Sequence, residues 1–515
     1  MIILKIVELI ETMLLVKFRS IVVFILCGVP FFTQAQTAKK ATFDFNKNCE
    51  KAYHQIIGLR IKNGSDIIAA EKKLNPNNPV VYYLEHEKDF MLFFIEEKES
   101  DFNHMIKEFD NRFSKVENAD VHAPLRRYLM AQMQLEVAIS KGKLGQFMTA
   151  FFYVRRGYNL LLENQKEFPN YTPNLIGLGL FHALIGTVPQ KYMWGVNMMG
   201  FYGNLEQGMG ELLKVQEYAQ KTPLYCQEEL DFIYVYGLLY MMNDKKGAWD
   251  KAKVMVNAHS DNLLYTFLGA TVAFASNYND DALKLLQNRP KGPEYMRFSY
   301  LDYMYGLAKL RRLDKDAAFY FEKFLLDRDR RNFVKDAYQK LAWCHLLNGN
   351  MEGYHKALAD CAVRGNAVVD ADKQAQRELE SKDIPNLTLL RARLLCDGGY
   401  YEKAIGELNG KKMDDFSQLK EKVEFVYRAG RIYHEWGYPD KAIPYYNLAT
   451  KYGANLPQWY EASAAVNLGL IYEQKGNKEL AKKYFQECID SKNTDFKNGL
   501  EQKARSGLER LKKKK

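Results

Sequence analysis

The chain has 515 residues, of which 47% are hydrophobic and 13% aromatic, and its formal net charge is +10. This length allows two to four compact domains or one long solenoid, and only 14 prolines with few alternating β-branched runs predict an almost entirely helical chain. The charge is modest for this size, and no stripe of Lys and Arg interleaves with aromatic residues, which argues against a nucleic-acid partner.

Residues 13–36 have the pattern of a secretory signal peptide. A positive flank precedes a short apolar run, and small and polar residues follow it (Lys17, Arg19, Ile21–Phe32, Thr33–Gln36). The run is too short to span a bilayer as a helix, and there is no second transmembrane candidate. We predict a signal peptide over 1–36, starting at Met1 or Met13 and cleaved near Ala35–Gln36. The mature chain is then periplasmic or secreted, with peripheral envelope association as one option; an uncleaved N-terminal anchor is the alternative.

Residues 37–225 are predicted to form a helical N-terminal region. Helical periodicity from Phe43 onward is interrupted by polar breaks such as Asn75–Pro79. His86 and Glu87 resemble a fragment of a zinc-protease motif, but the second His four residues after the first is missing. We therefore assign both residues a structural role.

A glycine-rich apolar segment, residues 174–213, lies within this region. Glycine in a helix interior costs about 1 kcal/mol each, so close helix contacts or a loop over the core must offset the cost. No Gly-Lys-Ser/Thr follows the glycines, which excludes a phosphate-binding loop. A Met- and aromatic-rich stripe in this segment is either core or a groove for an apolar ligand or partner helix (Met193, Trp194, Met198, Met199, Phe201, Tyr202).

The segment from Val423 to Ile489 contains one pattern twice, with matching residues 39 positions apart (Gly430 and Gly469, Tyr433 and Tyr472, Gly437 and Gly476, Ala442 and Ala481, Tyr446 and Phe485). A fixed period in this range is the signature of a solenoid. The pattern resembles the tetratricopeptide repeat, in which small residues let two helices approach and aromatic residues fill the adjacent space. That repeat is normally about 34 residues long, so Tyr452–Trp459 is the expected insertion between the two copies.

Less regular copies of the hairpin precede this pair from Gln227 onward. We predict tetratricopeptide-like repeats over 226–490 and a capping helix with a basic tail over 491–515. The charged segment Asn366–Pro385 is expected to be a solvent-exposed helix. The fold class predicted for the whole chain is therefore all-α, an α-solenoid of helical hairpins with a helical N-terminal half.

The order of motifs in residues 125–490 is similar to that of the tetratricopeptide-repeat protein 39 family. The motifs are a Gly-x-Gly pair, a Val-Pro, a Gly-Phe-Tyr-Gly before a helix, and a Tyr-x-x-Gly ahead of the repeats (Gly177, Gly179, Val188, Pro189, Gly200–Gly203, Tyr303, Gly306). The resemblance implies an all-helical, non-enzymatic repeat protein whose eukaryotic relatives are associated with lipid and organelle biology. The export signal and the N-terminal segment have no counterpart in that family.

No catalytic or metal-binding cluster can be assembled from the sequence. The nine His are scattered, no Gly-x-Ser-x-Gly elbow occurs, and the Cys residues lack metal-ligand spacing. Cys344 and Cys361 fall on the two helices of one predicted hairpin, so they are either a disulfide or two structural thiols. Buried acids cannot be identified from the sequence, which leaves a pair of catalytic carboxylates open. We expect no enzyme activity, no cofactor and no metal.

The inner face of the predicted solenoid is the candidate binding surface. In the tetratricopeptide repeat the first helix of each hairpin lines the concave side, which selects eight residues rich in Arg and Tyr (Tyr303, Gln339, Trp343, Arg393, Tyr427, Arg431, His434, Glu435). The alternative is that these residues only contact the neighbouring repeat.

The function predicted from these features is that of an exported repeat scaffold that binds an unidentified protein or peptide in a concave groove. A small-molecule, glycan or lipid-binding envelope protein is the alternative. Glycan-binding lipoproteins with such repeats carry a lipidated Cys after the signal, and none is present here.

Overall fold

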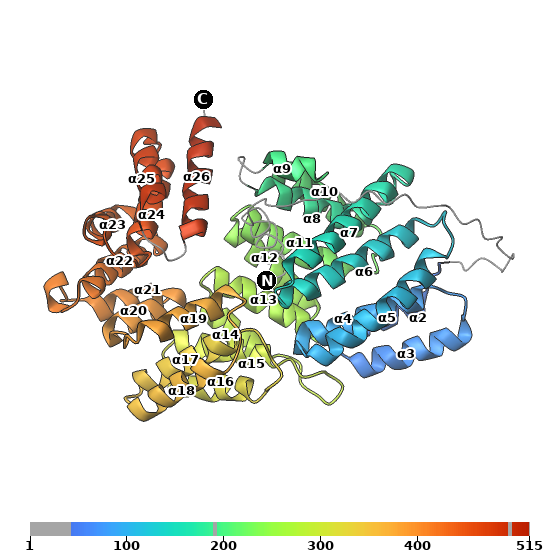
Figure 1. Ribbon diagram of the computed structural model, residues 1–515, viewed down its shortest axis with the longest axis horizontal. Helices are drawn as coiled ribbons and strands as arrows, with labels where there is room; N and C mark the ends of the chain where they lie inside the picture. Colours follow the sequence, from blue (N-terminus) through green and yellow to red (C-terminus); the bar gives the residue numbers. More distant parts are fainter. Residues whose placement is uncertain (1–42, 189–192, 493–496, 514–515) are drawn as a thin grey trace, which may run out of the picture.

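The computed structural model describes residues 43–188, 193–492 and 497–513, and within these ranges it contains 25 α-helices and no β-strand (Figure 1). The predicted signal peptide (1–36) and its cleavage site lie outside the described residues. Successive helices form hairpins that stack along the chain, so the predicted all-α solenoid is confirmed.

The N-terminal half begins with three helical hairpins, in which α2 pairs with α3, α4 with α5, and α6 with α7. Their apolar stripes form one continuous core with the helices that follow. The bounds are α2 (Lys47–Ile57), α3 (Ile61–Leu74), α4 (Val80–Glu96), α5 (Glu99–Glu117), α6 (Pro124–Lys143) and α7 (Phe147–Glu167).

The glycine-rich segment forms α8 (Asn174–Gly186), the short α9 (Met193–Met198) and α10 (Leu205–Ala219). Close contact between α8 and α10 requires glycine, because a Cβ added at Gly208 would lie 2.2 Å from the backbone nitrogen of Ala183. Tight helix packing therefore offsets the poor helix propensity of this segment.

The repeats occupy the remainder of the chain, first as paired helices and then as the two regular copies. α13 pairs with α14, α15 with α16, α17 with α18, α20 with α21, α22 with α23, and α24 with α25. The bounds are α11 (Gln227–Tyr236) with the π-helical turn η2 (Gly237–Met241), α12 (Lys245–Ala258), α13 (Leu263–Ala275), α14 (Asn279–Gln287), α15 (Tyr300–Arg311), α16 (Ala317–Leu325), α17 (Val334–Leu347), α18 (Met351–Val363), α19 (Asp370–Ser381), α20 (Leu387–Asp397), α21 (Tyr401–Leu408), the 3₁₀ turn η3 (Met413–Asp415), α22 (Leu419–Glu435), α23 (Pro439–Gly453), α24 (Tyr460–Gln474), α25 (Lys478–Asp490) and α26 (Lys497–Lys513).

The two regular copies use glycine at the same place. A Cβ added at Gly430 would lie 2.9 Å from the Tyr446 ring, and one added at Gly469 would lie 2.5 Å from the Phe485 ring. Both rings are fully buried. The 39-residue pattern thus encodes a contact in which an aromatic ring of the second helix lies directly on the backbone of the first.

The charged segment before α20 differs from its prediction. It forms a helix, α19, but this helix lies against α17 and is not simply solvent-exposed. Asp372, fully buried, accepts hydrogen bonds from the backbone nitrogens of Phe333 (2.7 Å) and Asp336 (3.0 Å). The acidic side chains that suggested a surface helix are used instead to fix α19 to the preceding repeat.

A loop between α16 and α17 joins the repeats to the N-terminal helices. Arg330 donates to the carbonyl oxygen of Ile95 (3.0 Å), and the side chain of Asn332 donates to Glu97 (2.9 Å). Glu97 also pairs with Lys143 at the end of α6 (2.6 Å), and both side chains are almost fully buried. Segments more than 180 residues apart in sequence are therefore held together by one buried polar cluster.

Candidate partner-binding cleft

Three of the eight predicted groove residues lie inside the solenoid. The hydroxyl of Tyr303 donates to Asp336 (2.5 Å), the amide of Gln339 donates to Glu378 of α19 (2.6 Å), and the Tyr427 hydroxyl is hydrogen-bonded to Ser463 (3.0 Å). Each of these three side chains is at most 5% exposed. They hold neighbouring helices together and present no surface to a partner.

Three further predicted residues form a polar network on α22. Arg431 pairs with Asp397 (2.7 Å) and with Glu435 (2.7 Å), while His434 lies 3.4 Å from the Tyr446 hydroxyl. Burial alone raises the pKa of Asp397, but the surrounding guanidinium groups, Arg431 foremost, lower it to about 2. Burial also lowers the pKa of His434. Arg431 therefore has its charge matched within the chain.

The remaining two, Trp343 and Arg393, line a cleft between α19, α20 and α22 with a volume of about 240 Å³. The Arg393 guanidinium lies over the Trp343 ring, 4.8 Å from its centroid, and the Arg393 side chain is 27% exposed. The Trp343 indole nitrogen donates to Glu378 (2.7 Å), which fixes the ring in the wall. Trp343 itself is only 2% exposed, so the group that faces the cleft is the Arg393 guanidinium, held from behind by the buried ring.

The opposite wall contains residues that the repeat rule did not select. Arg428 pairs with Glu424 (2.8 Å), and its guanidinium carbon lies 5.6 Å from the centre of the Tyr460 ring and 5.8 Å from that of Trp459. Trp459 ends the segment predicted to be an inter-repeat insertion. The end of the insertion is thus part of the cleft, and the consecutive aromatic residues Trp459 and Tyr460 were the signal in the sequence.

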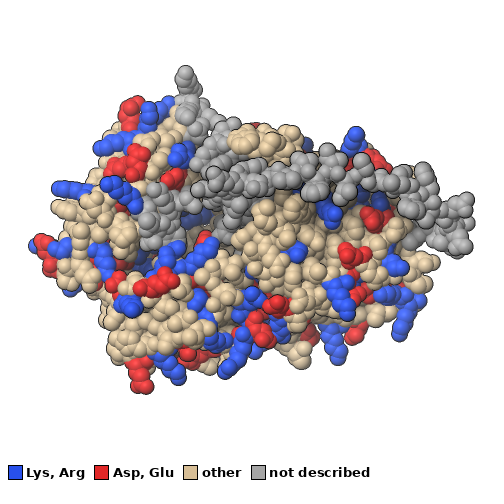
Figure 2. Space-filling model, in the orientation of Figure 1, with Lys and Arg blue, Asp and Glu red and all other residues tan. Residues whose placement is uncertain are grey.

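Charges of both signs line this cleft in equal number, four basic and four acidic residues (Arg377, Arg393, Lys420, Arg428, Glu378, Asp383, Glu421, Glu424). The two signs are also interspersed over the molecular face shown in Figure 2. The cleft therefore offers local charged and aromatic contacts without a strong net potential.

The Met- and aromatic-rich stripe of the glycine-rich segment does not line the cleft. Trp194 and Met198 are each 65% exposed and Tyr202 is 60% exposed, whereas Phe201 is buried against Phe151 and Tyr158. The stripe is therefore divided between core and surface.

The six cysteines of the described ranges are unpaired and buried. Burial raises the pKa of Cys344 to about 12 and that of Cys361 to about 11, so both remain protonated thiols at neutral pH. In the described part of the chain no group of three His, Cys, Asp or Glu side chains could hold a metal ion. None of the described helices is long and apolar enough to cross a bilayer.

Comparison with known proteins supports the repeat assignment at the C-terminal end. The family model of the tetratricopeptide repeat matches residues 423–452 and 462–495. No curated protein matches the sequence. Similar solved structures include yeast Tom70 (14% identity, TM-score 0.26, covering 90% of this chain and 96% of that one) and the Cut9–Hcn1 hetero-tetramer of the APC/C (10%, 0.25, 89% and 95%). A third is Naa15/Naa10 bound to HypK-THB (11%, 0.25, 90% and 65%).

At these TM-scores the structural alignments assign no function to this chain. The family match and the helix pairs agree, because α22 with α23 and α24 with α25 coincide with the two matched segments. The chain therefore contains tetratricopeptide repeats at residues 423–452 and 462–495, within an all-helical solenoid.

Proposed function

We propose that this chain is a non-enzymatic repeat scaffold that holds a protein or peptide partner in the cleft between α19, α20 and α22. Tetratricopeptide repeats build extended concave surfaces, which supports a binding role. The observation that supports this location is the stack of Arg393 on Trp343 in the cleft wall. Arg is enriched among the residues that dominate the binding energy of interfaces, and the ring beneath Arg393 holds its guanidinium in place.

The cleft chemistry defines the partner further. The half-buried rings of Trp459 and Tyr460 on one wall offer contact to an apolar or aromatic anchor residue, and the mixed charges around them suit a peptide that carries both signs. Arg393 would contact this anchor. Trp343 would hold the Arg393 guanidinium in place from behind, and Arg431, His434 and Glu435 would support the wall from the adjacent turn.

Selection of binding peptides from a random library tests this proposal and does not require the natural partner to be identified first. Arg393→Ala is expected to weaken binding of the selected peptides at least about tenfold. Arg391→Ala is the matched control, because Arg391 lies two residues away on α20 and its nearest carboxylate, Glu407, is 3.9 Å away. Two residues correspond to about 200° around a helix, which places the two guanidinium groups on opposite faces. Equal affinities of both variants would refute this location of the groove.

We also propose that the chain is exported. The support is the order of charged, apolar and small residues in 13–36, which is typical of a signal peptide. Intact-mass analysis of the mature protein is expected to give an N-terminus near Gln36. An N-terminus at Met1 or Met13 would contradict export with cleavage.

Kinship with the tetratricopeptide-repeat protein 39 family is a further proposal, based on the order of motifs in residues 125–490. A profile of that family should align its two glycine motifs with Gly177–Gly179 and Gly200–Gly203. An alignment confined to residues 423–495 would contradict this proposal, because the resemblance would then consist only of the tetratricopeptide repeat that many families share.

A further inference from the structure

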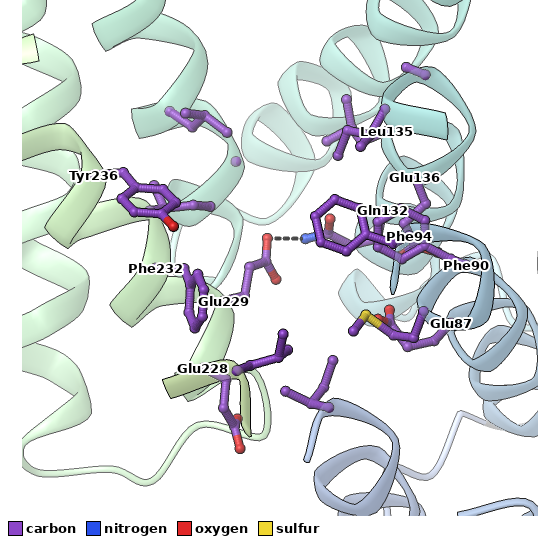
Figure 3. A pocket seen from close by; sticks show the side chains of 18 of the residues that line it. Glu87, Phe90, Phe94, Gln132, Leu135, Glu136, Glu228, Glu229, Phe232 and Tyr236 are labelled. Atoms are coloured by element: carbon purple, nitrogen blue, oxygen red, sulfur yellow. Dashed lines mark hydrogen bonds between the residues drawn. The ribbon is translucent and has the colours of Figure 1, made fainter. Parts of the chain in front are cut away.

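A second cavity lies in the N-terminal half, far along the chain from the proposed peptide cleft. It has a volume of about 200 Å³ and is enclosed mainly by α4 and α6 on one side and by α8, α11 and α13 on the other (Figure 3). An apolar cavity of about 150 Å³ is large enough for a benzene-sized ligand. This cavity therefore has room for a small organic molecule.

The walls of the cavity are predominantly apolar. Rings and branched side chains that recur on one face of each helix project into it (Phe90, Phe94, Leu135, Ile139, Phe232, Phe267). So few polar groups line the remainder that the cavity cannot match the many hydroxyl groups of a sugar. The body of a ligand that fits here is hydrocarbon or aromatic.

Four carboxyls are among the polar groups that line the cavity, and one of them, Glu228, pairs with His54 (2.7 Å). Glu229 extends from α11 and accepts a hydrogen bond from Gln132 (2.6 Å; Figure 3). It accepts another from Tyr128 (2.9 Å), and Glu87 accepts one from Tyr83 (2.9 Å). Among the described residues, neither carboxyl forms an ion pair. The lining residue Lys143 is already paired with Glu97.

Burial and the neighbouring Glu87 carboxyl, with which Glu136 shares a hydrogen bond, raise the pKa of Glu136 well above its usual value. Its side chain is only 8% exposed, and its Oε2 atom forms no hydrogen bond, although His86 Nε2 lies 3.4 Å away. Burial lowers the pKa of His86 to about 3, so this ring is neutral at physiological pH and supplies no compensating charge. A buried polar atom without a partner costs free energy, which a bound donor would recover.

We propose that this cavity binds an apolar primary amine, with its ammonium group between Glu136 and Glu229 and its hydrocarbon or aromatic body against the Phe-lined walls. An ammonium group supplies three donors and a positive charge, and the two carboxyls, whose pKa values burial raises, would ionise against it. A carboxylate ligand of the same size would be repelled. An alcohol would fill the space without supplying a positive charge.

Calorimetric titration with 2-phenylethylamine, 2-phenylethanol and 3-phenylpropanoate tests this proposal directly. The amine is expected to bind at least about tenfold more tightly than the alcohol, and the acid is expected not to bind. The double variant Glu136→Gln/Glu229→Gln should weaken amine binding at least about tenfold and leave alcohol binding unchanged. Glu206→Gln, an exposed site on α10, is the control and should change nothing.

A cavity-filling variant provides a test that keeps all the carboxyl groups. A Cβ added at Gly142, which lines the cavity in the last turn of α6, would meet no heavy atom within 4 Å. Gly142→Leu should therefore fold, as circular dichroism can check, and should abolish binding of both amine and alcohol. Equal affinity for amine and alcohol, no amine binding, or amine binding that survives Gly142→Leu would each overturn the proposal.

Discussion

Glu97 is buried and Glu229 is half-buried at the cavity wall, and their pKa values shift in opposite directions. Burial favours the neutral form of each carboxyl. At Glu97 the charges of Lys143 and Arg330, with hydrogen bonds from Lys143 and Asn332, outweigh burial and lower the pKa to about 2. At Glu229 the hydrogen bonds from Gln132 and Tyr128 offset burial only in part, and the pKa rises to about 7. The neighbouring cations therefore decide which buried acid is charged.

Lys143→Met is expected to destabilise the junction between the N-terminal helices and the repeats. Removing one partner leaves Glu97 buried and unpaired, which costs about 3–5 kcal/mol. Native-state hydrogen exchange of α4 and α6 measures the loss as a lower opening free energy. Lys141→Met is the control, since its ammonium group lies over the rings of Phe102 (5.5 Å) and Tyr153 (5.6 Å), and should cost no more than about 1 kcal/mol. Equal losses in the two variants would contradict the role of the pair.

Glu229→Gln is expected to change how stability depends on pH. Because the pKa of Glu229 is raised in the folded chain, its stabilising contribution is complete below about 4.5 and is lost as the pH rises through about 7. Relative to Glu229→Gln, the wild type should lose about 3 kcal/mol between pH 4.5 and pH 8. Urea denaturation at the two pH values measures this difference. A stability difference that does not vary with pH, or an equal response in Glu206→Gln, would contradict the shift.

Helix α19 is the element that turns a stack of hairpins into a cleft. It leaves the alternating pattern of the repeats and lies against α17, where Glu378 accepts hydrogen bonds from both Gln339 and Trp343. Residues of α19 then form one wall of the cleft. The inserted helix therefore both covers part of the concave face and shapes the part that remains open.

Glu378→Ala is expected to loosen α19. The Trp343 indole nitrogen and the Gln339 amide both lose their acceptor, at a cost of about 1–3 kcal/mol. Faster hydrogen exchange in residues 370–381 and a shifted Trp343 fluorescence maximum would report the change. Glu380→Ala is the control, because Glu380 lies two residues away and is exposed. This variant loses only a surface hydrogen bond from Gln376 (2.7 Å), so hydrogen exchange should be unchanged. Unchanged exchange in Glu378→Ala would show that α19 is held by other contacts.

The hairpins could be predicted from the sequence because each one is specified locally. Gly430 and Tyr446 are in contact within one helix pair. The same contact recurs 39 residues later between Gly469 and Phe485, which makes the pattern recognisable in the sequence. The cleft depends on contacts between distant segments, such as Arg428 with Trp459 and Glu378 with Trp343, that no spacing encodes. The same holds for the N-terminal cavity, because Glu87, Glu136 and Glu229 lie on three helices and their sequence spacing is irregular.

Across the molecule, two cavities of different chemistry lie on one helical scaffold. The C-terminal cleft is lined by aromatic rings and balanced charges, and the N-terminal cavity is apolar with unmatched carboxyls. Figure 1 shows the described helices following one another from α2–α7 through the repeats to α22–α26. The buried cluster of Glu97, Lys143, Arg330 and Asn332 joins the first helices to the middle repeats, so the scaffold positions both cavities.

The most direct test of the scaffold proposal is hydrogen–deuterium exchange of the full mature chain, with and without a saturating selected peptide. We predict slower exchange in α19, α20 and α22 on binding, and no change in α4, α6 and α11 around the N-terminal cavity. Protection that spares α19, α20 and α22, or that falls only on the N-terminal helices, would contradict a partner held inside the repeats.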